Sequence, residues 1–124
     1  MSLTDIHGRL ADAALYYMLL ISIWAFYRFF RRQSLDSSFW GALAIAEFLL
    51  VAQLLIGVYL WTQGFRPPRT IHALYGFLIP VMIPGAYQYT RGRAGNPEFL
   101  VYATTTIVTV GLIFRAIFTG EISI

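Results

Sequence analysis

Long apolar stretches with almost no charge dominate the chain and alternate with short polar segments. Four such stretches run over about 10–27, 39–62, 70–90 and 99–119. Each has close to the roughly 20 residues that a helix needs to cross the hydrocarbon core of a bilayer. Their apolar residues form continuous runs, such as LLVAQLLIGVYLW, and do not alternate with polar residues as strands of a membrane barrel do. The pattern predicts an all-α integral membrane protein with four spans.

The connecting segments contain residues that end and start helices. Asp36 and the two serines after it are candidate N-caps, and the other two connections contain glycine and proline. Because all three connections are short, consecutive helices should run antiparallel. We therefore expect residues 1–124 to form a single transmembrane domain, an up-and-down four-helix bundle. Pro80 and Pro84 each remove a backbone hydrogen bond, so the third span should be distorted over IPVMIPGAY (79–87).

Composition narrows the class of protein. The chain is 58% hydrophobic and only 12% charged, about half the charge of an average soluble domain. This excludes a soluble enzyme, and the short connections leave no room for a catalytic domain, so we expect a non-catalytic subunit. The chain has no cysteine, which excludes thiolate ligands and disulfides.

The net charge of +3 comes from arginines that flank the apolar runs. They form no single basic face, so lipid and not nucleic acid is the expected partner. Five arginines lie on one side of the predicted bundle, at positions 28, 31, 32, 91 and 93, and three lie on the other, at positions 9, 66 and 69. The positive-inside tendency then places both termini outside the cytoplasm, most simply in a bacterial cytoplasmic membrane.

The chain has only two histidines, His7 and His72, and each lies near the start of an odd-numbered span. In an up-and-down bundle these spans start on the same face, so both imidazoles should lie at a similar depth. Neutral imidazole is a good ligand for iron, and inward-facing side chains are how helix bundles hold cofactors. The two residues are therefore candidate axial ligands of a haem b.

Small and basic residues at the same depth fit that hypothesis. Room for a macrocycle is expected beside three glycines, Gly57, Gly76 and Gly111, and propionate partners are expected among three arginines, Arg9, Arg69 and Arg115. A simpler interpretation stands beside this one. Small residues also let membrane helices pack closely, and a histidine near a helix end can lie among lipid headgroups.

Glu47 lies well inside the second span, where a carboxylate costs about 2.5–3.5 kcal/mol on insertion scales. It should therefore face the protein interior or be protonated. Ser22, Thr106 and Thr109 are the polar side chains expected at a similar depth. A proton relay or a quinone contact is the functional interpretation. Pairing with Arg28, or extension of the side chain to the membrane surface, is the structural one.

The run QLLIGVYL (53–60), a short loop and then HALYGFL (72–78) resembles the helix–loop–helix pattern of haem A synthases and related membrane b-type cytochromes. The resemblance implies a haem-binding antiparallel bundle in which His7 and His72 match the ligand positions. Synthases of this family join two such bundles and many carry a cysteine pair. This chain has one predicted bundle and no cysteine, so the resemblance implies haem binding and not synthase activity.

These patterns together predict a haem b-binding electron-transfer subunit of a respiratory or photosynthetic membrane complex. Its expected partners are the bilayer, other subunits of that complex and a quinone near Glu47. The alternative is a cofactor-free accessory subunit whose helices stabilise a larger membrane complex.

Overall fold

The regular elements of the chain are all helical. The computed structural model describes residues 2–67 and 69–121, and no strand occurs among them. The elements are α1 (Leu3–Phe30), α2 (Ser37–Thr62), α3 (Ile71–Leu78), the 3-10 turn η1 (Ile79–Val81), α4 (Met82–Thr90) and α5 (Asn96–Glu121). The predicted all-α class is confirmed.

Three of these helices, α1, α2 and α5, are long and apolar enough to cross a membrane in the described part of the chain. They extend beyond the predicted spans, most clearly at the start of α1. There Ser2 accepts a hydrogen bond from the Asp5 amide at 3.1 Å, and Asp5 accepts one from the Ser2 amide at 3.3 Å. This reciprocal cap stabilises the first turn, so the helix begins at Leu3 and not near Leu10.

The third predicted span is not one continuous helix. It consists of α3, η1 and α4, which have 8, 3 and 9 residues. At 1.5 Å per residue neither α-helix alone approaches the roughly 30 Å of a hydrocarbon core. Pro80 lies in η1, so the distortion expected around the prolines is observed.

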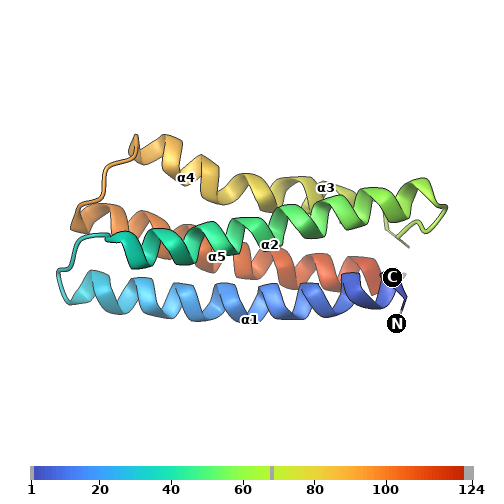
Figure 1. The fold of residues 1–124 in the computed structure, drawn as a ribbon, viewed down its shortest axis with the longest axis horizontal. Coiled ribbons are helices and arrows are strands. Elements are labelled where there is room, and N and C mark those ends of the chain that lie inside the picture. The colour runs from blue at the N-terminus through green and yellow to red at the C-terminus, as the bar shows by residue number, and fades with distance from the viewer. Residues whose placement is uncertain (1, 68, 122–124) are drawn as a thin grey trace.

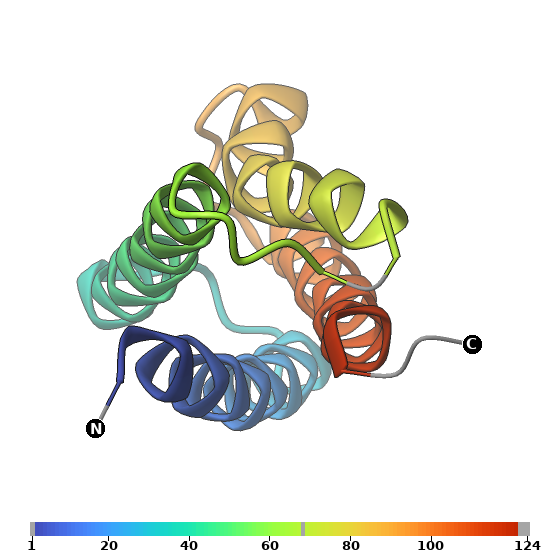
Figure 2. The same cartoon turned by 90° about the vertical axis from the view of Figure 1, so that its right-hand side faces the viewer.

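The helices lie lengthwise beside one another (Figure 1). Helix α1 packs against α2 and α5, whereas α3 and α4 pack mainly against α5. In the end-on view α1 and the α3–α4 segment lie on opposite sides of the molecule (Figure 2). Helix α1 begins and α5 ends at the same end of the molecule.

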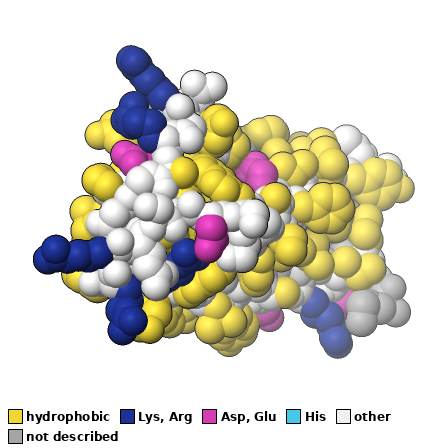
Figure 3. All heavy atoms as spheres, turned by 60° about the vertical axis from the view of Figure 1, so that its left-hand side comes forward, with side chains coloured by type: hydrophobic (Ala, Val, Ile, Leu, Met, Phe, Trp, Pro, Cys, Tyr) yellow, Lys and Arg dark blue, Asp and Glu magenta, His cyan; other side chains and the backbone are white. Residues whose placement is uncertain are grey.

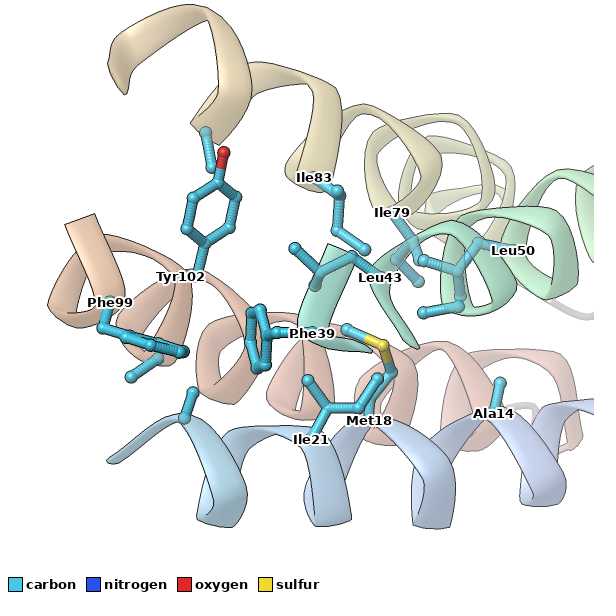
Figure 4. Packing of buried hydrophobic residues seen from close by; sticks show 14 of the residues in the cluster. Ala14, Met18, Ile21, Phe39, Leu43, Leu50, Ile79, Ile83, Phe99 and Tyr102 are labelled. Atoms are coloured by element: carbon cyan, nitrogen blue, oxygen red, sulfur yellow. The ribbon is translucent and has the colours of Figure 1, made fainter. Parts of the chain in front are cut away.

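Buried side chains fill the half of the molecule that adjoins the α1–α2 and α4–α5 connections (Figure 4). Phe39 is fully buried there and contacts the rings of Phe99 and Tyr102 at centroid distances of 4.8 and 6.5 Å. Toward the other end the buried cluster borders the cavity described below, which Ala14, Leu50, Ile79 and Ile113 also line.

Arg28 links the α1–α2 connection to the first turn of α5 at the well-packed end. Its guanidinium donates to both carboxylate oxygens of Asp36, at 3.0 and 2.9 Å, and to Gln33 Oε1 at 2.6 Å. The ring of Phe99 lies 5.0 Å from the guanidinium carbon. The alternative in which Arg28 pairs with Glu47 is therefore wrong, because Arg28 forms its ion pair with Asp36, the N-cap of α2, which lies closer in the chain.

Arginine side chains gather at this same end, while the flank of the molecule is mostly hydrophobic (Figure 3). The two connections are also joined directly. The Leu35 amide donates to the Ala94 carbonyl at 2.9 Å, and Asn96 Nδ2 donates to the Phe29 carbonyl at 3.1 Å. The connections that carry Arg31, Arg32, Arg91 and Arg93 thus form one basic surface.

Replacing Asp36 with asparagine is expected to lower thermal stability at neutral pH. Hydrogen bonds from Arg28 hold the pKa of Asp36 well below its ordinary value, with smaller contributions from Ser38 and the Phe39 amide. Because the folded-state pKa is the lower one, the stabilisation is present at neutral pH and is lost as the pH falls below about 4.

Unfolding midpoints measured in detergent at several pH values test this prediction. The difference between wild type and Asp36→Asn should shrink as the solution is acidified. Asp12→Asn, at an exposed position of α1, is the matched control and should leave the midpoint nearly unchanged. Equal midpoints for wild type and Asp36→Asn at pH 7 would contradict the role given to this ion pair.

Candidate functional site

The two histidines meet at the end of the molecule where α1 begins. His7 lies in the second turn of α1, and His72 is the second residue of α3. Their ring centroids are 6.2 Å apart and the ring planes are inclined by 76°. Two helices on opposite sides of the molecule therefore bring the only two imidazoles of the chain together in a T-shaped arrangement.

This spacing matches two imidazoles that share one metal ion. A metal–nitrogen bond is about 2.0–2.1 Å, and a ring nitrogen lies about 1.1 Å from the ring centre, so two opposed ligands have centroids roughly 6.3 Å apart. Direct T-shaped packing of two rings covers about 4.5–7 Å. The observed separation of 6.2 Å therefore fits both direct packing of the rings and an ion held between them.

A cavity of about 610 Å³ adjoins both histidines. Cofactor and ligand sites usually occupy about 300–1,000 Å³ and are mostly apolar. Small residues from all the surrounding helices leave this space open, among them Gly8, Ala11, Gly57, Ala73, Gly76 and Ala116. Gly57 and Gly76 were expected at the site, and both line the cavity.

Each imidazole lies against a glycine of a neighbouring helix. A Cβ atom built on Gly57 would lie 3.3 Å from Cε1 of His7, and one on Gly120 would lie 2.8 Å from Cε1 of His72. From the sequence, Gly111 and not Gly120 was the expected glycine on this helix. That choice is wrong for the lining of the cavity, because α5 continues to Glu121 and its last turns lie level with the histidines, while Gly111 is exposed farther along the helix.

The two imidazoles differ in their hydrogen bonds. His72 Nδ1 donates to the Ala116 carbonyl at 2.7 Å, which leaves Nε2 as the nitrogen with a free lone pair. His7 Nδ1 is buried and has no partner. Beside it, Gln53 Nε2 donates to the backbone carbonyl of His7 at 2.6 Å, while Gln53 Oε1 is buried without a partner.

The arginine beside the cavity is not one of those expected. Arg9, Arg69 and Arg115 are exposed and do not line the cavity, whereas Arg66 does. Its guanidinium lies 4.7 Å from the Trp61 ring, and its Nε donates to the Trp61 carbonyl at 3.4 Å. The connection after α2 folds back over the end of that helix, a path that no sequence pattern indicated.

Glu47 does not line the cavity. One of its carboxyl oxygens is buried without a partner, as expected for a costly group inside a span. The polar residues expected beside it bond elsewhere. Ser22 donates to the Ala103 carbonyl at 3.4 Å, and Thr106 and Thr109 donate to carbonyls of their own helix at 2.8 and 2.7 Å.

Comparisons with known proteins add nothing to this geometry: no family model, curated protein or solved structure matches the chain. Within residues 2–67 and 69–121, no three histidine, cysteine or acidic side chains lie close enough together to hold a metal ion. The described part of the chain thus offers two nitrogen ligands at this site, His7 and His72.

Proposed function

We propose that this chain is an up-and-down four-helix membrane protein that holds one haem b between His7 and His72. In this proposal it transfers electrons as a subunit of a respiratory or photosynthetic membrane complex. The observation that carries the proposal is the 6.2 Å separation of two imidazoles beside a large, mostly apolar cavity.

The donor set favours a haem over a bare ion. Two imidazoles from the protein complete an octahedral iron when a porphyrin supplies the other four nitrogens, and the apolar lining suits the macrocycle. His72 is already held in the tautomer that presents Nε2 as a ligand, because its Nδ1 donates to Ala116. His7 is the second candidate ligand. Its buried Nδ1 has no hydrogen-bond partner, so no hydrogen bond fixes the tautomer of this ring.

Bound there, the haem supplies a one-electron couple between ferric and ferrous iron. His7 and His72 would both be engaged in holding the iron, which would leave neither imidazole to act on a substrate. Glycines and alanines of the surrounding helices line the cavity, and the well-packed half of the molecule fixes the helices that carry the two histidines. This arrangement favours electron transfer over chemistry on a bound molecule.

Two further parts of the proposal concern the membrane. The basic surface formed by the α1–α2 and α4–α5 connections would face the cytoplasm, which places both termini outside it. Glu47, with its unpartnered carboxyl oxygen, would exchange a proton or contact a quinone.

An absorption spectrum of the purified protein, expressed with an adequate supply of haem, tests the central claim. The oxidised protein should show a Soret band, and reduction with dithionite should sharpen the visible bands, as in six-coordinate haem. A protein that folds as a helical membrane protein and shows no haem bands would instead support the cofactor-free accessory subunit.

Arg66→Ala is expected to weaken haem retention about three- to tenfold, because a charge-assisted hydrogen bond to a propionate contributes about 1.5–3 kcal/mol before screening by solvent. Transfer of haem to apomyoglobin measures the loss. Arg91→Ala, at the opposite end of the molecule, is the control. Weakened haem retention in Arg115→Ala but not in Arg66→Ala would favour the arginines that the sequence predicted as propionate partners.

A further inference from the structure

The two candidate ligands, His7 and His72, differ in the hydrogen bonding of Nδ1. The difference points to a third residue that acts on one of them. His72 has an acceptor for its Nδ1 proton, the Ala116 carbonyl, whereas His7 Nδ1 is buried without one. A metal-bound histidine almost always donates its other ring N–H to an acceptor, which fixes the tautomer and raises the basicity of the ligating nitrogen. If His7 is a ligand, its acceptor has to come from a group close by.

Gln53 of α2 is that group. It lines the same cavity as His7, and its Nε2 already donates to the His7 carbonyl at 2.6 Å. The amide is therefore tied to the residue whose ring nitrogen lacks a partner. Its own Oε1, the acceptor end, is also buried and unpaired. Gln53 thus carries an acceptor without a hydrogen-bond partner, and His7, to which it is bonded, carries a ring nitrogen without one.

We propose that Gln53 is the positioning residue for His7, with Nδ1–H of His7 donating to a bridging water that in turn donates to Gln53 Oε1. The two atoms are not in direct hydrogen-bond contact, and a water between them would accept a hydrogen bond from Nδ1 and donate one to Oε1. Nε2 of His7 is then unprotonated and free to ligate, as Nε2 of His72 already is. This proposal rests on the haem hypothesis only where it concerns the bound iron.

Potentiometric titration of the haem-loaded protein gives the first test. Gln53→Met removes the acceptor and should favour ferrous iron by about tenfold, or 59 mV for a one-electron couple. Gln53→Glu supplies a stronger acceptor and should shift the potential in the opposite direction. Gln88→Met, an exposed substitution on α4, is the matched control and should leave the potential unchanged. Shifts of the same sign in both Gln53 variants, or none in either, would overturn the proposal.

Nitrogen NMR of the cofactor-free protein gives the second test and needs no haem. With His72→Asn used to assign the remaining ring, His7 should be the Nδ1–H tautomer in wild type and a mixture of tautomers in Gln53→Met. The same mixture of His7 tautomers in wild type and in Gln53→Met would refute the role of Gln53 even if haem binds. If His7 shows the expected tautomer and the wild type takes up no haem, the haem hypothesis fails and the tautomer assignment stands.

Discussion

His72→Ala is expected to abolish the spectrum of six-coordinate haem. The variant removes one of the two nitrogen ligands, and His7, the other histidine, cannot supply both axial positions. The expected result is protein with little or no haem, or with a broadened five-coordinate spectrum. Absorption spectra of wild type and variant, purified in parallel from cells supplied with haem, measure the difference.

Rescue by a small molecule separates ligand loss from misfolding. The alanine leaves space beside the cavity, so added imidazole should restore the six-coordinate spectrum. His7→Ala should behave in the same way, because the two rings are 6.2 Å apart and contribute one ligand each. A wild-type spectrum in either variant without added imidazole would show that the two histidines are not the ligand pair.

Gly120→Ala is expected to lower haem occupancy by tenfold or more. Its new methyl group would lie 2.8 Å from Cε1 and 3.0 Å from Nδ1 of His72, closer than side chains tolerate. The imidazole is held by its hydrogen bond to the Ala116 carbonyl, so relief of the overlap breaks that bond and tilts the ring away from His7. The ratio of haem to protein in the purified variant measures the effect.

Two other glycines provide a graded control. Gly57→Ala places a methyl group 3.3 Å from Cε1 of His7 and should cause a smaller loss of haem. At Gly111, on the same helix as Gly120, nothing lies within 4 Å, so Gly111→Ala should leave occupancy unchanged and gain up to about 1 kcal/mol of helix stability. Equal haem content in the Gly120 and Gly111 variants would contradict the contact.

The features that could be predicted from the sequence are those that depend only on where residues lie along the chain. Charge-free runs predicted the helices, and the positions of His7 and His72 at the starts of odd-numbered spans predicted that they would lie at one end. Pro80 and Pro84 predicted a distortion of the third span, and the structure adds its form, a 3-10 turn between two short α-helices.

What could not be predicted depends on how each helix is rotated and where it ends. Gly120 was missed because the last span was expected to end near Thr119, and only the observed extension of α5 brings Gly120 beside His72. Gln53 was missed because one glutamine in an apolar run carries no periodic signal. Arg66 was missed because it lies in a connection whose path depends on Gly64, which has a φ of +91°.

The position of the histidine pair along the helices has a consequence for electron transfer. His7 lies about 6 Å of helical rise from the start of α1, and about 35 Å of the same helix continues beyond it to Phe30. The chain has no other histidine, so its far half holds no second imidazole pair. A haem held by this pair would lie near the surface of the bilayer at which α1 begins, so electrons would reach it more readily from that side.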